Sequence, residues 1–165
     1  MPVTEVQIEQ ANSQFWGQMV GVEMQRVAPS AWLDAIQVTG RCHLSGAWTG
    51  RVEVRMTHGL AKMATCAMLA VPEDSVQRED MIDAVKEIAN MIAGTLKSTL
   101  PRPCAMTVPE AAVETKATYQ EEPATCSAEF LHQQGRLIVR MVESLGSQNS
   151  SHRNTRPQVE EALTA

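Results

Sequence analysis

The residue pair with the clearest capacity for chemistry lies in the segment from Asp80 to Ser98. Glu87 and Asn90 are three positions apart, so on a helix their side chains stand on one face and point the same way. Ala93 and Gly94 follow one turn later, and both are small. The spacing predicts a carboxylate and a carboxamide on a rigid helix, with bare surface beside them for the backbone of another molecule.

A solvated helix face is the simpler interpretation of the same residues. Polar side chains on the outer face of an amphipathic helix usually contact only water. However, Asn and Gly each cost about 0.5–1 kcal/mol of helix stability relative to Ala. Their use at the centre of an exposed face is unexpected if stability alone selected them. On this pattern by itself, both interpretations stay open.

The helix expected to position this pair is strongly amphipathic. Acidic residues at its start and Lys97 at its end suit the helix dipole, and Pro101 closes it. On a wheel of about 100° per residue, Asp83, Glu87, Asn90 and Gly94 gather on one side. Apolar residues gather on the opposite side, namely Ile82, Val85, Ile88, Ala89, Ile92 and Leu96. This side is expected to face the core.

Hydrophobic periodicity predicts the elements around this helix. They are a helix over 4–19 with Phe15 and Trp16 as core anchors, a hairpin over 36–44 and 48–56, a helix over 57–70, a short strand over 104–108 and a hairpin over 126–130 and 137–141. The helix over 57–70 is apolar nearly all round and is expected to be buried. The hairpins have one apolar and one polar face, so we expect the apolar face on a core and His43, on the polar face, in solvent. The stretch 110–122 fits a strand or a loop. The order predicts an α+β fold, a largely antiparallel sheet packed with long helices.

Length and composition limit the organisation and the partners. The chain has 165 residues, 44% hydrophobic and 20% charged, with a net charge of −5. We expect one domain over residues 1–145 and a flexible tail over 146–165, where apolar residues are sparse. Because no basic cluster or long apolar run occurs, nucleic acid and membrane are not expected as partners. The four cysteines lack C-x-x-C spacing, which favours reduced thiols in a cytoplasmic protein over disulfides or zinc.

The segment from Asp83 to Lys97, followed by Leu100-Pro101, resembles the motif helix of the CheC/CheX/FliY family of chemotaxis phosphatases. It is most similar to the CheX-like branch, in which an E-x-x-N pair precedes a small residue, a Gly and a Leu-Pro stop. Here the pair is Glu87 and Asn90, and the order of elements is similar over about 3–144. CheC-type members carry two such pairs. Because the helix over 57–70 has none, the resemblance implies a single site.

The resemblance implies that the substrate is the aspartyl phosphate of a CheY-like response-regulator receiver domain. Asn90 would orient the attacking water, because a neutral amide can donate and accept hydrogen bonds without repelling a phosphoryl anion. Glu87 would pair with the receiver lysine, and the docking surface around the pair would comprise Asp83, Lys86, Ala93 and Gly94. The receiver supplies its own Mg²⁺, so no metal or cofactor is expected on this chain. A homodimer is expected.

Two alternatives of other classes stay open. The chain can be a non-catalytic module of the same fold that binds or assembles with a receiver without hydrolysing its phosphate. It can also be a small-molecule sensor with a pocket beneath the sheet.

Overall fold

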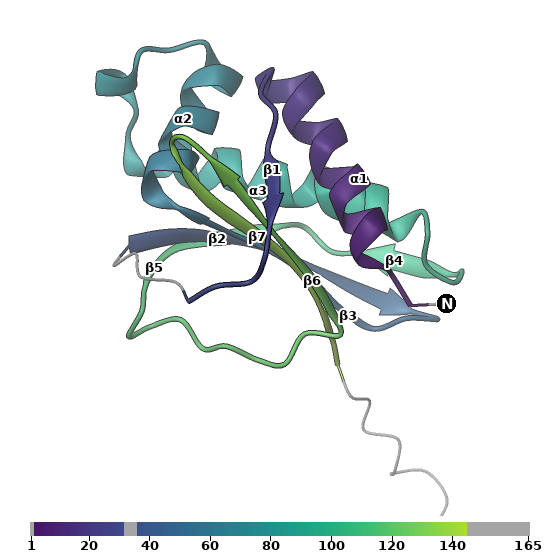
Figure 1. Ribbon diagram of the computed structural model, residues 1–165. Coiled ribbons are helices and arrows are strands. Elements are labelled where there is room, and N and C mark those ends of the chain that lie inside the picture. Colours follow the sequence, from purple (N-terminus) through teal and green to yellow (C-terminus); the bar gives the residue numbers. More distant parts are fainter. Residues whose placement is uncertain (1, 32–35, 145–165) are drawn as a thin grey trace, which may run out of the picture.

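The computed structural model describes residues 2–31 and 36–144. Within these ranges one seven-stranded sheet has the order β1-β6-β7-β3-β2-β4, with β5 also paired to β2, and every strand pair is antiparallel. The elements are α1 (Glu5–Phe15), a π-helical turn (Trp16–Val20), β1 (Gln25–Val27), β2 (Ile36–Gly46), β3 (Gly50–Thr57), α2 (His58–Leu69), a 3-10 turn (Glu73–Ser75), α3 (Arg78–Lys97), β4 (Cys104–Met106), β5 (Glu110–Thr115), β6 (Cys126–His132) and β7 (Gly135–Glu143). The α-helices cover one face of the sheet, and the chain between β5 and β6 crosses the other face (Figure 1). The predicted α+β fold is confirmed.

Helix α1 begins and packs as its sequence predicts. The Thr4 side chain accepts a hydrogen bond from the Gln7 backbone, and the Gln7 side chain accepts one from the Thr4 backbone, which is a capping box. Phe15 and Trp16 are buried edge to face, with ring centroids 5.6 Å apart, so both are core anchors. Met19, the last residue of the predicted helix, is exposed, because the π-helical turn after Phe15 changes the helical phase.

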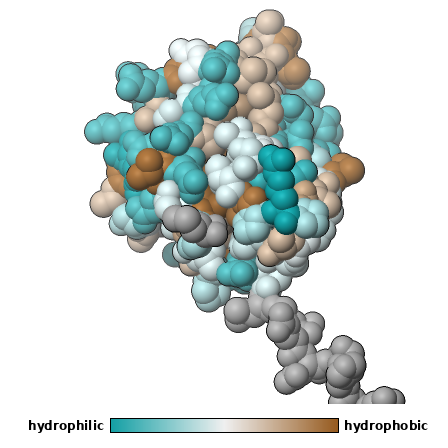
Figure 2. Space-filling view, turned by 90° about the vertical axis from the view of Figure 1, so that its right-hand side faces the viewer, coloured by the Kyte–Doolittle hydropathy of each residue, from teal (hydrophilic) through white to brown (hydrophobic). Residues whose placement is uncertain are grey.

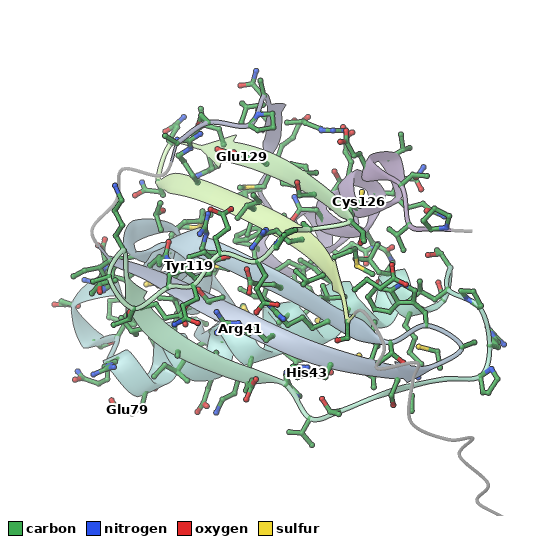
Figure 3. The ribbon with its side chains drawn as sticks, turned by 90° about the horizontal axis from the view of Figure 1, so that it is seen from below. Arg41, His43, Glu79, Tyr119, Cys126 and Glu129 are labelled. Carbon is green, nitrogen blue, oxygen red and sulfur yellow. The ribbon has the colours of Figure 1, made fainter. Side chains whose placement is uncertain are left out.

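The hairpin of β2 and β3 forms the centre of the sheet, and both of its faces are covered. Cys42 and Val54 are buried under the helices. On the opposite face Thr39 and Glu53 are also 0% exposed. The prediction of one apolar face on the core is confirmed, but the expectation that the polar face lies in solvent is wrong for these residues. The segment between β5 and β6 covers it, while His43, nearer the strand end, is exposed as expected (Figures 1 and 3).

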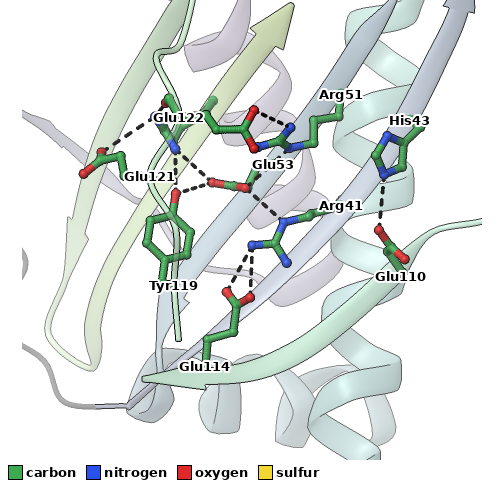
Figure 4. Close-up of polar contacts among 10 residues, drawn as sticks. Arg41, His43, Arg51, Glu53, Glu110, Glu114, Tyr119, Glu121 and Glu122 are labelled. Atoms are coloured by element: carbon green, nitrogen blue, oxygen red, sulfur yellow. Dashed lines mark hydrogen bonds and ion pairs between the residues drawn. The ribbon is translucent and has the colours of Figure 1, made fainter. Parts of the chain in front are cut away.

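A charged network fixes this covering segment to the sheet (Figure 4). The Glu53 carboxylate accepts hydrogen bonds from the Tyr119 hydroxyl, from Arg41 Nε at 3.0 Å and from Arg140 Nη1 at 3.1 Å. The Arg55 guanidinium lies over the Tyr119 ring, with its Cζ atom 4.1 Å from the ring centroid. Burial alone would raise the pKa of Glu53, but the Tyr119 hydrogen bond and the two arginine charges lower it below its ordinary value.

Helix α2 is buried along one side only. Leu60, Ala61, Ala64 and Thr65 are buried, whereas Leu69 is 50% exposed. The expectation that this helix is buried therefore holds for one of its sides and is wrong for the other. It contacts α3, the sheet and the π-helical turn through one side, and its other side faces outward.

The strands after α3 follow the prediction with two additions. The strand that begins at Cys104 ends at Met106, and the ambiguous stretch 110–122 contains β5 and part of the covering segment. The second hairpin is confirmed by the pairing of β6 with β7. Strand β1, which pairs with β6, was not predicted, because three residues are too few to show an alternation. The predicted tail over 146–165 and the domain limit at 145 lie outside the described residues.

Two further properties bear on the choice of function. All four cysteines are free thiols. In the described ranges, no helix combines the length and the apolar character needed to cross a lipid bilayer.

Candidate functional site

Helix α3 presents its apolar side to the core as expected. It begins at Arg78, two residues before the predicted start, and the backbone N–H of Gln77 donates to the Asp80 carboxylate at 2.9 Å. Ile82, expected in the buried set, is only partly buried. The buried residues are Met81, Ala84, Val85, Ile88, Ala89, Ile92, Ala93 and Leu96.

A glycine in the sheet allows α3 to lie unusually close to β2. A Cβ atom at Gly40 would be 2.8 Å from the backbone oxygen of Val85 and 2.9 Å from the Cβ of Ala89. Both residues belong to the buried side of α3 and flank Glu87 in sequence. Because the backbones meet with so little intervening side chain, the sheet holds this part of the helix firmly.

The exposed side of α3 carries a stripe of residues at positions 83, 87, 90, 94 and 97, which we call the α3 stripe. These positions lie within about 80° of one another on a helix of 100° per residue. Glu87 and Gly94 are exposed and Asn90 is partly exposed, so the structure brings together the predicted pair and the bare position after it. Both side chains lie on the side of α3 away from the core, as the helical wheel predicts.

The docking residues named from sequence divide into two groups. Asp83 is exposed, and its carboxylate forms an ion pair with Lys86 Nζ at 3.2 Å, so both are accessible on the helix surface. Gly94 lies in the α3 stripe. Ala93 is 0% exposed and belongs to the core side, so its assignment to a docking surface is wrong.

The two central side chains of the α3 stripe have no partner inside the described part of the molecule. Neither Glu87 nor Asn90 forms a hydrogen bond or an ion pair with a described residue, whereas Glu53 and Glu129 are fully engaged on the other face of the sheet. A free carboxylate can receive a cation, and a free amide can both donate and accept hydrogen bonds. No group of three His, Cys, Asp or Glu residues suited to a metal ion occurs in the described ranges.

The α3 stripe lies between two surface depressions that sequence reasoning did not find. Beside Glu87 is a hollow of about 260 Å³ lined by Met68, Leu69, Asp80, Asp83, Ala84 and Glu87. Beyond Gly94 is an open groove of about 730 Å³, which we call the Gly94 groove, lined by Gly94, Lys97, Ser98, Arg102, Pro103 and Cys104. Lys97 could have been found from sequence, because it continues the spacing of the α3 stripe. Leu69 and Arg102 could not, since they come from other segments.

A larger hollow of about 910 Å³ lies on the opposite face of the sheet, around Arg55, Tyr119 and Arg140. None of its lining residues belongs to α3. This hollow is the candidate site for the sensor alternative, and it lies on the face of the sheet opposite Glu87 and Asn90.

Comparison with known proteins identifies the family and supports the fold. The family model described as "Chemotaxis phosphatase CheX" matches residues 38–131. The chain is similar in structure to the chemotaxis protein CheX from Vibrio vulnificus, with 20% identity, a TM-score of 0.69, and 84% of this chain and 94% of that chain covered. It is also similar to a chain of the CheX–CheY–BeF3–Mg²⁺ complex from Borrelia burgdorferi, with 18% identity, a TM-score of 0.64, and 83% of this chain and 95% of that chain covered. A third similar structure is FliY from Thermotoga maritima, with 12% identity, a TM-score of 0.56, and 87% of this chain and 93% of that chain covered. No protein with a curated description matches the chain.

Proposed function

Because the chain belongs to the CheX family of chemotaxis phosphatases, we propose that it accelerates hydrolysis of the aspartyl phosphate on a CheY-like response-regulator receiver domain. The observation that carries this proposal is the α3 stripe, on a firmly packed helix. In it Glu87 is exposed and Asn90 partly exposed, and neither has an intramolecular partner among the described residues. The similarity to a CheX chain crystallised with CheY, BeF3 and Mg²⁺ supports the choice of partner.

Hydrolysis of an acyl phosphate needs mainly a well-placed water molecule. The water oxygen attacks phosphorus in line with the bond to the aspartyl oxygen, that bond breaks, and the carboxylate leaves with its electron pair. The protons of the water remain with the inorganic phosphate that forms. Charge is spread over the phosphoryl oxygens in the transition state, so positioning and electrostatics dominate catalysis. In our proposal Asn90 enters the receiver cleft and its amide holds the water in line.

Glu87 has a separate role in this proposal. It is one helical turn from Asn90 on the α3 stripe, so a cation bound to it lies beside the cleft that Asn90 enters. A lysine of the receiver is the proposed partner, and a charge-assisted hydrogen bond to it fixes the docking register. Asp83, Lys86 and Gly94 form the surrounding contact surface. The Mg²⁺ ion is proposed to be held by the receiver, so this chain supplies no metal ligand.

Replacement of Asn90 tests the catalytic role. The Asn90→Ala variant should lose about 10²-fold of the accelerated dephosphorylation rate, because the water is no longer oriented. Asn90→Asp should lose at least as much, since a carboxylate repels the phosphoryl dianion. The measurement is the decay of a ³²P-labelled CheY-like receiver with catalytic amounts of each variant.

Stability and receiver binding of Asn90→Ala serve as controls for its folding. Alanine favours a helix more than asparagine does, so Asn90→Ala should unfold at an equal or higher urea concentration than the wild type. Binding of a receiver loaded with BeF3 and Mg²⁺ should also persist. Equal decay with the wild type and Asn90→Ala would eliminate catalysis and leave the non-catalytic binding module, provided that the loaded receiver still binds.

We also propose that the protein acts in the cytoplasm as a homodimer. The cytoplasm follows from the proposed substrate, and the dimer from the resemblance to CheX-like proteins. Light scattering over a concentration series measures the mass in solution. A monomer at all concentrations would refute the proposed dimer without affecting the phosphatase proposal.

A further inference from the structure

Gly94 occupies a position where the fold itself has no use for a glycine. It lies inside α3, where glycine destabilises the helix relative to alanine. A Cβ atom there would meet no heavy atom of the described residues within 4 Å, in contrast to Gly40, whose Cβ would collide with α3. Packing within the described chain therefore does not explain the missing side chain. Its position on the α3 stripe, about 6 Å along the axis from Asn90, points instead to close approach by another molecule.

The groove beside Gly94 is cationic in an acidic protein. Lys97 and Arg102 line it, and neither forms an ion pair with any residue that the structure describes. Lys62 and Lys86, by contrast, each pair with a neighbouring carboxylate. Because the chain carries a net charge of −5, two unpaired cations in one groove are a local departure from the overall charge.

The opposite end of the α3 stripe has the opposite charge. Asp80, Asp83 and Glu87 line the hollow at that end, together with the exposed Leu69. The α3 stripe thus runs from acidic through the neutral Asn90 and Gly94 to basic. A partner with two oppositely charged flanks would dock in one direction only, because the reversed arrangement would place like charges together.

The lining of the Gly94 groove carries two cations, Lys97 and Arg102, and no large apolar side chain. Figure 2 views the side that carries α1 and β4 and shows hydrophilic, intermediate and apolar residues interspersed, with the most apolar residues in separate groups. Cys104, the first residue of β4, lines the Gly94 groove. A segment held in this groove should therefore be polar and negatively charged.

We propose that the Gly94 groove binds an acidic segment of the receiver bordering its phosphorylation site, with Gly94 admitting the segment's backbone and Lys97 and Arg102 pairing with its carboxylates. This inference rests on the proposed function and adds the direction in which the receiver docks. The receiver's lysine lies at the Glu87 end of the α3 stripe, its phosphorylated residue at Asn90 and its acidic segment at Lys97.

Three variants test this arrangement. Gly94→Leu fills the point of closest approach, and Lys97→Glu and the double variant Lys97→Glu/Arg102→Glu reverse the charge of the groove. The probes are CheY-like receivers of the same organism, loaded with BeF3 and Mg²⁺ for affinity by calorimetry and phosphorylated for kinetics. Gly94→Leu should raise Kd and KM about tenfold or more, since it obstructs the centre of an interface. Lys97→Glu should raise both about fivefold and the double variant further, with kcat within about twofold of the wild type.

Matched controls separate these effects from general damage. A Cβ atom at Gly17, in the π-helical turn, would also meet no heavy atom within 4 Å, so Gly17→Leu makes the same change away from the groove. Lys116→Glu makes the same charge reversal in the exposed part of the segment on the other face of the sheet. Both controls should keep the wild-type Kd. Added salt should weaken binding by the wild type more than by the double variant, because salt screens the proposed ion pairs.

The outcomes distinguish this inference from the proposed function. If Asn90→Ala abolishes hydrolysis while Gly94→Leu and the double variant keep the wild-type Kd, the docking inference is wrong and the phosphatase proposal stands. If the variants weaken binding of a loaded receiver as predicted but the wild type does not hydrolyse the receiver phosphate, the docking inference stands and the phosphatase proposal is wrong. If no loaded receiver binds the wild type, both are overturned.

Discussion

Replacing Gly40 with alanine tests whether close packing of α3 on the sheet supports the site. The new Cβ would lie 2.8 Å from the Val85 oxygen, 2.9 Å from the Ala89 Cβ and 3.0 Å from the Val85 Cγ1, where ordinary contacts are 3.4–4 Å. Helix α3 would have to retreat from β2 by about half an ångström or more. Overpacking of this kind costs about 1–3 kcal/mol. Alanine recovers up to about 1 kcal/mol, because glycine loses more conformational freedom than alanine when the chain folds into a strand.

Because the nearest atom is a backbone oxygen, which cannot move aside alone, the overpacking cost should lie in the upper part of this range, about 2–3 kcal/mol. After the gain of about 1 kcal/mol, Gly40→Ala is expected to lower the free energy of unfolding by about 1–2 kcal/mol. Urea unfolding followed by tryptophan fluorescence measures it, because Trp16 is fully buried and reports on the core. Gly17→Ala is the control, since its Cβ meets no heavy atom within 4 Å. A Gly40→Ala protein that unfolds at the wild-type urea concentration or above would refute the claim that this contact holds α3 in place.

The remaining predictions concern the buried network and the thiols. Tyr119→Phe keeps the ring over Arg55 but removes the hydroxyl that donates to Glu53, so it should lower the free energy of unfolding by about 2 kcal/mol in urea titrations. Because the pKa of Glu53 is lower in the folded protein, its stabilising effect is present above the unfolded pKa of about 4.3 and is lost as the pH falls through the folded value. The urea midpoint should therefore fall on acidification below about pH 4, and less steeply in Glu53→Gln; equal slopes in both proteins would contradict this. Burial raises the pKa of Cys42 to about 11, so native protein at pH 8 should leave this thiol unmodified by iodoacetamide while denatured protein reacts, as peptide mapping would show.

Helix α3 was predictable because its information is local. The alternation of apolar and polar residues at the helical period over one continuous segment determines which side is buried, and Glu87 and Asn90 lie on the predicted side. The error at Ala93 has a geometric cause. It follows Asn90 by three residues, but it lies about 120° from Glu87 around the axis, which places it on the core side. Closeness to one member of a pair does not ensure a shared surface with the other.

The covered polar face of the sheet was not predictable, because its information is distributed along the chain. Glu53 comes from β3, Tyr119 from the covering segment and Arg140 from β7. Taken one at a time in the sequence, each of these polar side chains could equally well lie at the surface. Only their mutual contacts make burial tolerable, since a buried charge is strongly unfavourable without partners. Period-two alternation identifies a polar face, but it does not show whether another segment covers it.

The contrast between these two polar groups bears on where chemistry should be sought. Glu53 is inaccessible and its hydrogen-bonding capacity is satisfied inside the fold, so its network stabilises the scaffold. Neither Glu87 nor Asn90 forms a hydrogen bond or an ion pair with a residue that the structure describes. Asn90 and Gly94 also lower the stability of the helix that carries them. Residues that reduce local stability without a compensating internal contact are expected at functional positions. This difference, rather than the number of charged groups, places the proposed chemistry on α3.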